Sequence, residues 1–217
     1  MNISNMDLNI NKLTDLTLQM MDKCQNIVIK SVDAMVAKDI EKSKEILILD
    51  NEIDDLRSYI RDKSIELIAL KQPLATDLRI IHALGVIAIE LERVGDYAVN
   101  IAMETIKIGN DEYVEKLIDI PKMKDVCVSM LINAKKALQE NDEKLAYKTG
   151  LQDDIVDELY NDVYVDALGA MHKNVDNINQ GVKLLFVGRY LERIGDHITN
   201  ICELVIYAIK GEMIEID

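Results

Sequence analysis

A repeated segment is the feature of this sequence that most constrains its fold. Residues 91–96 read LERVGD, and residues 191–196 read LERIGD, one hundred residues later. Over the eleven positions that begin at each segment, seven residues are identical. A second repeat lies upstream, where the Asp-x-x-x-Asp-x-Leu pattern that starts at Asp50 recurs at Asp153. A period near 100 residues is too long for a solenoid unit, so we infer a duplicated domain.

The composition between these repeats is typical of helices. The 217 residues include only two prolines and nine glycines, too few turn formers for many short strands. Apolar residues make up 49% of the chain but include one Phe and no Trp, so the core must consist of aliphatic side chains and Met. The sequence therefore predicts an all-α fold.

Apolar residues recur at helical spacing almost throughout, so helix ends must be found where this pattern breaks. The breaks are Pro73, the 109–111 segment, Pro121, Asn141 and the polar 172–181 segment. They predict six long helices near 2–37, 39–71, 74–108, 122–139, 142–171 and 182–210. With the duplication, these helices form two tandem three-helix bundles, at residues 1–109 and 110–217.

Three helix ends carry recognisable capping residues. Asp39 and Asn141 are predicted to be N-caps, since their short polar side chains can accept hydrogen bonds from the first turn of a helix. Gly211 follows Lys210 and is predicted to end the last helix.

The net charge of −14, from 25 basic and 39 acidic residues, argues against nucleic acid as a partner. Cys24, Cys127 and Cys202 are widely spaced and read as buried residues of a protein in a reducing compartment. The longest mid-chain run without formal charge, residues 80–89, is too short to span a membrane. We expect a cytoplasmic protein with no integral membrane segment.

The repeated acids stand in unusual positions. On the predicted third helix, Glu92 and Asp96 lie at the edge of an apolar stripe formed by Leu84, Ala88, Leu91, Gly95, Ala98 and Ala102. The preceding helix carries its own i, i+4 acid pair in each half, so four carboxylates can converge where consecutive helices pack. Protons, arginines or metal cations must then offset their mutual repulsion. Gly95 and Gly195 would allow a close approach there.

Other interpretations of these acids stay open. Arg57 and Arg61 follow Asp54 at i+3 and i+7, so the first acid pair can belong to an ordinary salt-bridged helix face. A metal-free helical scaffold is then sufficient. A carboxylate-bridged metalloenzyme is a further alternative, but no catalytic residue is identified, because the sequence shows no nucleophile motif, phosphate-binding loop or Glu-x-x-His pair.

The motifs together resemble those of the PhoU family of phosphate-uptake regulators. The resemblance rests on the two LER-[Val/Ile]-GD segments, on the Lys71-Gln72-Pro73 entry that leads to Asp77-Leu78-Arg79, and on the closing segments 200–203 and 210–211. It implies a non-enzymatic negative regulator of phosphate uptake and phosphate-starvation signalling, with the transporter's ATPase subunit and a sensor histidine kinase as partners. Homodimers are common in the family.

The resemblance also implies metal clusters on the family's Glu/Asp-x-x-x-Asp motifs, with iron, zinc, manganese or magnesium as the bound ion. The matching positions are Asp50, Asp54, Glu92, Asp96, Asp153, Asp157, Glu192 and Asp196. Supporting residues around these ligands would be Arg93, Asn100, Arg193, Asn200 and Glu203. Because Arg93 and Arg193 point about 100° away from the neighbouring Glu, we expect supporting contacts from them rather than direct neutralisation.

The two halves differ in ways that predict unequal sites. The second half lacks the Gln-Pro-x-x-x-Asp-Leu-Arg entry, and Glu203 stands where the first half has Met103. The second site should therefore be the more acidic.

Overall fold

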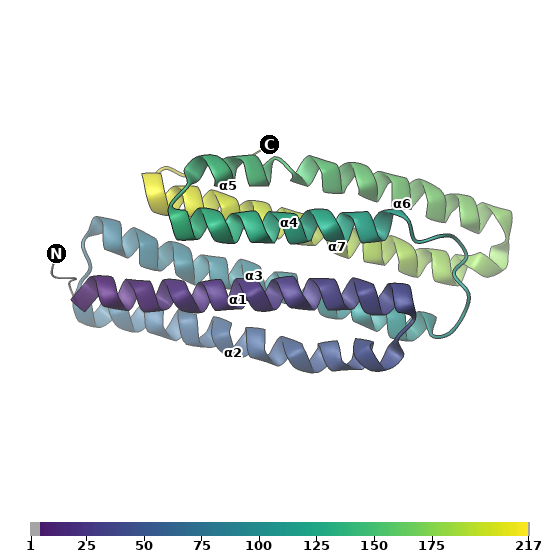
Figure 1. Ribbon diagram of the computed structural model, residues 1–217, viewed down its shortest axis with the longest axis horizontal. Coiled ribbons are helices and arrows are strands. Elements are labelled where there is room, and N and C mark those ends of the chain that lie inside the picture. The colour runs from purple at the N-terminus through teal and green to yellow at the C-terminus, as the bar shows by residue number, and fades with distance from the viewer. Residues whose placement is uncertain (1–4, 217) are drawn as a thin grey trace.

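The computed structural model describes residues 5–216, a range in which the chain forms α-helices, one 3₁₀ helix and no strand. The first half contains α1 (Asn5–Ala37), α2 (Ile40–Lys71) and α3 (Ala75–Ile108). The second half contains α4 (Asp119–Glu140), α5 (Glu143–Gly150), α6 (Asp153–Lys173), the 3₁₀ helix η1 (Val175–Asn177) and α7 (Ile178–Lys210). Figure 1 shows the two halves lying lengthwise beside each other, each built of long helices.

The predicted all-α fold of two duplicated helical bundles is confirmed, with one helix divided. The predicted helix at 142–171 is interrupted at Leu151 and Gln152, which separates α5 from α6. At this break the N–H of Gln152 bonds to the carbonyl of Thr149, three residues back, so the α-helical pattern is locally tightened. Gly150, with its low helix propensity, immediately precedes the break. Residues 2–4 of the first predicted helix lie outside the described residues.

Two of the three predicted caps are confirmed. Asp39 accepts a hydrogen bond from the N–H of Lys42 at 3.0 Å, and Gly211 ends α7 with φ +85°. The prediction for Asn141 is wrong, because its φ of 52° places it at the left-handed C-terminal end of α4. Asn adopts this backbone conformation more readily than most residues, and the neighbouring Asp142 caps α5 instead, accepting from Lys144 and Leu145.

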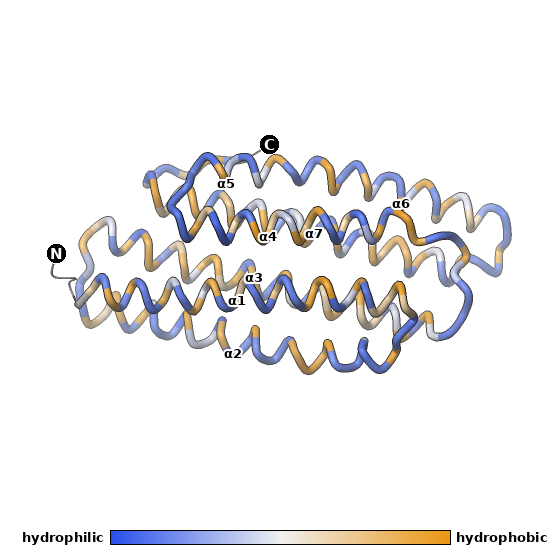
Figure 2. Tube along the Cα trace, in the orientation of Figure 1, coloured by the Kyte–Doolittle hydropathy of each residue, from blue (hydrophilic) through white to orange (hydrophobic). Residues whose placement is uncertain are grey.

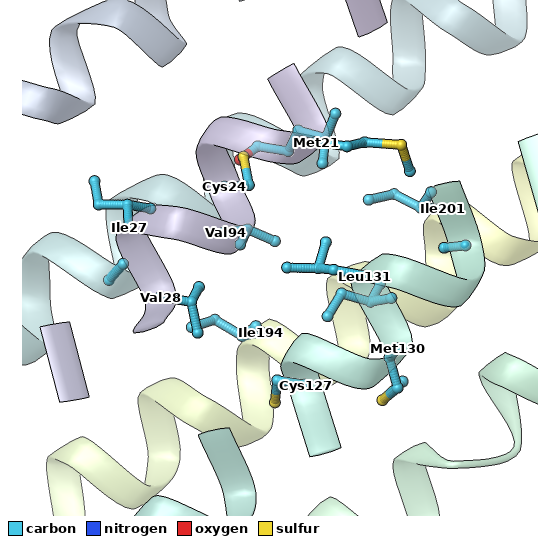
Figure 3. Close-up of a cluster of buried hydrophobic side chains, with 14 of the residues drawn as sticks. Met21, Cys24, Ile27, Val28, Val94, Cys127, Met130, Leu131, Ile194 and Ile201 are labelled. Carbon is cyan, nitrogen blue, oxygen red and sulfur yellow. The ribbon is translucent and has the colours of Figure 1, made fainter. Parts of the chain in front are cut away.

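The core is continuous across both halves, because α3 and α7 pack against each other as well as against the helices of their own bundle. Figure 3 shows Met21, Cys24 and Val28 of the first half facing Leu131 and Ile194 of the second. All five side chains are at most 1% exposed. Along most of the helices, hydrophobic and hydrophilic residues alternate (Figure 2), which is the pattern expected of helices that are partly buried.

The duplication extends to the first helix of each half. Cys24 on α1 donates its thiol to the carbonyl of Leu91 at 3.2 Å, and Cys127 on α4 makes the same contact with Leu191 at 3.5 Å. Burial raises the pKa of both thiols. As predicted, all three cysteines are free and buried.

The segment that joins the halves is fastened to both of them. Gln180 on α7 accepts a hydrogen bond from the N–H of Val114 at 2.7 Å and donates one to the carbonyl of Glu112 at 3.0 Å. Tyr113 donates its hydroxyl to the carbonyl of Met35 at the end of α1. The connection therefore has few degrees of freedom, while domain boundaries at 109 and 110 stay a prediction.

None of the helices in residues 5–216 combines the length and the apolar character needed to cross a bilayer.

We expect Ile194→Ala to lower the free energy of unfolding by about 2–5 kcal/mol, because this fully buried side chain lies between the halves and its removal leaves a cavity. Urea unfolding followed by circular dichroism at 222 nm measures the change. Ile132→Ala, at a 45% exposed position, should change the free energy of unfolding by less than about 0.5 kcal/mol. Two separate unfolding transitions in the wild-type protein would contradict a continuous core.

Candidate metal centre

The first cluster of acids lies between α2 and α3. Asp50 and Asp54 come from α2, and Glu92 and Asp96 come from α3. Gly95 makes room for this arrangement, because a Cβ atom at its position would lie 2.5 Å from Oδ1 of Asp50. The glycine thus admits the Asp50 carboxylate against the surface of α3, where almost any other residue would exclude it.

The second cluster repeats this geometry between α6 and α7. Asp153 and Asp157 come from α6, and Glu192 and Asp196 come from α7. A Cβ atom at Gly195 would overlap Oδ1 of Asp153. The eight predicted acids thus lie on two helix pairs, four in each half, where Asp54 and Asp157 are exposed and the other six are at least half-buried.

Burial and the charges of neighbouring acids disfavour the ionised form of four of the cluster carboxyl groups. Burial, followed by the charges of its three cluster neighbours, raises the pKa of Asp50 to about 6. Burial, followed by the charges of Asp196, Asp157 and Glu192, raises the pKa of Asp153 to about 7. Burial also raises the pKa of Asp157 and of Glu192. The charged form is therefore disfavoured for Asp50 in the first half and for Asp153, Asp157 and Glu192 in the second.

One oxygen atom on each of four cluster residues is buried and has no hydrogen-bond partner. These atoms are Oδ1 of Asp50, Oε2 of Glu92, Oδ1 of Asp153 and Oε2 of Glu192. Oε2 of Glu92 and Oε2 of Glu192 each lie within ion-pair distance of an arginine, whereas Oδ1 of Asp50 and Oδ1 of Asp153 have neither a hydrogen bond nor an ion pair, which is energetically unfavourable. A cation in either cluster would supply the missing partner, so the chemistry of these atoms fits a metal.

Arginines neutralise one side of each cluster. Arg93 pairs with Asp96 at 3.1 Å and approaches Glu92 at 3.5 Å. Arg193 pairs with Asp196 at 2.7 Å and lies 3.6 Å from Glu192. Each arginine therefore neutralises the acid three residues later on its own helix, and its support of a bound metal stays a prediction.

Salt bridges within α2 do not neutralise the first acid pair, Asp50 and Asp54. Arg61 pairs with Asp62 at 2.9 Å, and Nε of Arg57 is buried without a hydrogen-bond partner. Among the described residues, neither arginine forms an ion pair with Asp50 or Asp54. The arginines that meet the cluster acids come from α3 and α7, and they include Arg189, which pairs with Glu192 and which the sequence analysis did not single out.

The side chains are not arranged as a finished coordination sphere. In the part of the chain that the structure describes, no three His, Cys, Asp or Glu side chains are close enough together to hold an ion. The carboxylate donors and the unpaired oxygens fit a metal. In the present side-chain conformations, however, arginines form ion pairs with some of the acids of each cluster.

Two of the remaining predicted support residues, Asn200 and Glu203, lie near the second cluster. Asn200 donates to Oε2 of Glu90 at 3.0 Å, and Glu203 accepts the N–H of Ile216 at 2.9 Å. Both line a cavity of about 650 Å³ whose wall also includes Asp153 and Asp196. In the first half, Asn100 is half-buried one helical turn beyond Asp96. That these residues support a metal stays a prediction.

A polar contact between the halves lies beside these clusters. Nδ1 of His197 is 2.7 Å from Oε2 of Glu90, which joins α7 to α3. Burial raises the pKa of Glu90, but the hydrogen bonds from His197 and Asn200 outweigh it, and the pKa is lowered overall. The equivalent positions on the other side hold Tyr97 and Tyr190, whose rings lie 5.9 Å apart. The sequence analysis missed this contact, since no spacing within one helix reports on it.

Comparison with known proteins gives one consistent family. The PhoU domain model matches residues 17–105 and again residues 120–205. The chain is 34% identical over 201 residues to the phosphate-specific transport system accessory protein PhoU homolog of Clostridium acetobutylicum, covering 92% of each chain. It is 29% identical to the homolog of that name from Deinococcus radiodurans, over 89% of this chain and 91% of that one.

Two solved structures share the whole architecture. The crystal structure of PhoU from Pseudomonas aeruginosa matches with a TM-score of 0.91 and 26% identity, over 95% of this chain and 99% of that one. The phosphate transport system regulatory protein PhoU from Streptococcus pneumoniae matches with a TM-score of 0.90 and 25% identity, over 97% of this chain and 100% of that one.

We expect the metal-free protein to lose stability as pH rises from about 4 to about 7. The ordinary pKa of an Asp carboxyl, 3.8, applies to the unfolded chain, whereas Asp153 has a pKa of about 7 in the folded protein. Between these values the folded state holds a proton that the unfolded state has released, so rising pH favours unfolding.

Asp153→Asn should remove this contribution and leave the variant more stable than wild type at pH 8 in EDTA. The expected gain is about 1 kcal/mol, once the partial exposure of the carboxyl and solvent screening are allowed for. Urea unfolding at pH 5 and pH 8 measures it, with Asp154→Asn, an exposed neighbour, as control. A variant less stable than wild type at pH 8 would contradict the unfavourable burial of this charge.

Proposed function

The chain belongs to the PhoU family, and from that premise we propose that it is a regulatory accessory protein of phosphate transport. Its role is to repress phosphate uptake and phosphate-starvation signalling when phosphate is sufficient. It acts without catalysis, as a cytoplasmic adaptor between the ATPase subunit of the phosphate ABC transporter and a sensor histidine kinase. It works as a homodimer.

The observation that carries this proposal is the match of the family model to both halves of the chain, with the relatives covered along nearly their whole length. The function named for those relatives is therefore proposed for a chain that shares both of their domains. A rigid helical body suits an adaptor, which must bind one conformation of its partner better than another and so shift the balance between them.

The proposal includes a metal ion or cluster at each group of acids. Asp50, Asp54, Glu92 and Asp96 would hold it in the first half, and Asp153, Asp157, Glu192 and Asp196 in the second. Oxygen donors suit iron, manganese or magnesium, and zinc is a further candidate. When bound, the metal would neutralise the carboxylates and tie α2 to α3 and α6 to α7. The unpaired buried oxygens in both halves support this.

A metal-free scaffold is the second candidate, and a specific observation favours it. Arg93, Arg189 and Arg193 already pair with acids of α3 and α7, and no described group of three ligand side chains stands ready for an ion. In a metal-free scaffold, one buried oxygen of Asp50 and one of Asp153 have no partner, whereas a bound metal would provide one for each. We therefore rank the metal sites first.

Elemental analysis of protein purified without chelator tests the metal. We expect Asp153→Asn, Asp157→Asn, Glu192→Gln and Asp196→Asn, combined in one variant, to remove about half of the bound metal, because they disable one of two clusters. Circular dichroism should show an unchanged helix content.

The matched control changes four acids on the outer surface of α6. They are Asp154, Glu158, Asp162 and Asp166, which are all exposed. This variant should keep all of its metal. Gly195→Ala is a second probe. It keeps all eight proposed ligand residues, but its methyl group would fill the space occupied by the Asp153 carboxylate. Wild-type protein as free of metal as the cluster variant would favour the scaffold.

The regulatory role is tested in a strain that lacks this chain. With abundant phosphate, a reporter fused to a phosphate-starvation promoter should be expressed strongly, and radiolabelled phosphate uptake should rise. The wild-type chain and the exposed-acid control should restore repression. Unchanged reporter expression and uptake after deletion would contradict the role.

Two assays with purified protein separate the adaptor from an enzyme. The chain should bind the isolated ATPase subunit and the cytoplasmic part of the kinase in calorimetric titrations. Metal-loaded protein should hydrolyse p-nitrophenyl phosphate no faster than the free metal does. Turnover lost in the cluster variant would instead support the metalloenzyme.

A further inference from the structure

The segment after α7 folds back over the second half of the protein. Residues 211–216 leave the end of α7 and return beside α5, so that the C-terminal end of the chain lies near the break between α5 and α6 (Figure 1). Ile214 and Ile216 are half-buried, whereas Glu212, Met213 and Glu215 are exposed. This alternation places two isoleucine side chains against the protein, as in an extended segment with one side bound.

The end of the segment fits a notch beside the second cluster. A Cβ atom at Gly150 would lie 2.7 Å from Cδ1 of Ile216, so the missing side chain of the glycine creates the space that Ile216 fills. The N–H of Ile216 donates to Glu203 at 2.9 Å. Ile216 also lines the cavity of about 650 Å³ that holds Asp153 and Asp196.

The beginning of the segment is held by the first half of the protein. Arg79 on α3 donates to the carbonyls of Ala208 at 3.2 Å and Ile209 at 3.4 Å, in the last turn of α7. Its guanidinium occupies the place where a side chain at Gly211 would stand. A cation at the C-terminal end of a helix is favourable, so Arg79 fixes the point from which the segment departs.

The first cluster has no such covering among the described residues. Met103 occupies the position of Glu203 and is 39% exposed. The helix that carries Asp50 and Asp54 is continuous, and Leu47 stands at the place that corresponds to Gly150 by the offset of the acid pairs. Neither the acceptor nor the notch is repeated there.

We propose that residues 211–216 form a strap that covers one side of the second carboxylate cluster and slows the access of solutes to Asp153. Opening requires Ile214 and Ile216 to leave the surface and Glu203 to lose the N–H of Ile216. Glu203 is then freed beside Asp153 and Asp196. The slowed exchange of metal ions rests on the proposed function. The coverage of the cluster by the strap does not.

Carboxyl labelling tests the closure without metal. Protein in EDTA is treated with a water-soluble carbodiimide and glycine ethyl ester, and the labelling rates of Asp153 and Asp50 are measured by peptide mass spectrometry. Replacing both strap isoleucines, Ile214→Gly with Ile216→Gly, should raise the Asp153 rate about tenfold, since apolar burial of two side chains is lost. The Asp50 rate should not change.

The matched control places two glycines at exposed positions of the same segment, Met213→Gly with Glu215→Gly. It loosens the backbone equally but keeps the isoleucines, so the Asp153 rate should stay near the wild-type value. An unchanged Asp153 rate in the isoleucine variant, or an equal increase in the control, would overturn the strap. Circular dichroism and labelling of Asp50 show whether the fold is intact.

Release of Mn²⁺ tests the consequence for ions. In a background with Asp50→Asn and Glu92→Gln, which disables the first cluster, protein loaded with Mn²⁺ is mixed with excess EDTA and free Mn²⁺ is followed. The isoleucine variant should release Mn²⁺ about tenfold faster than the background protein. If wild-type protein binds no Mn²⁺, manganese is excluded as the ion of the proposed site, and the labelling rates alone decide the strap. Equal release rates in a protein that does bind Mn²⁺ would overturn the slow exchange of ions.

Discussion

The whole structure depends on the third helix of each half being buried on more than one side. α3 packs on α1 and α2 and also on α7, while α7 packs on α4, α5 and α6 and also on α3. Most of their buried positions are therefore aliphatic or small, and polar groups must lie along the borders between neighbouring packing surfaces. The repeated acids occupy such borders, which explains why they are close to the core and yet reach arginines and cavities.

Glycine decides how close the acids of neighbouring helices come. Without side chains at Gly95 and Gly195, Asp50 and Asp153 lie directly against α3 and α7. The result is a pair of sites in which carboxylates are held where their charges are poorly solvated. A protein that needed only stable helices would gain from alanine at both positions. The glycines therefore serve the acid clusters at the expense of helix stability.

Much of this could be predicted from the sequence, because helices and their ends depend on local residues. The duplication, the aliphatic stripe and the cap at Asp39 all follow from spacing. Local reasoning failed for contacts between residues far apart in the sequence, such as Glu90 with His197 across the two halves and Ile216 with Gly150. Another signal was present and missed, since Cys24 and Cys127 are separated by the same 103 residues as Asp50 and Asp153.

The contact between α3 and α7 also shows what joining two similar halves in one chain makes possible. Two identical halves associating symmetrically would have to make every contact twice, so a glutamate facing a histidine on one side would face one on the other. In this chain, Glu90 meets His197 on one side, and Tyr190 meets Tyr97 on the other. Covalent fusion has released these positions from self-complementarity. The two ends of the contact between α3 and α7 are therefore chemically different, one polar and one aromatic, although the two halves share one fold.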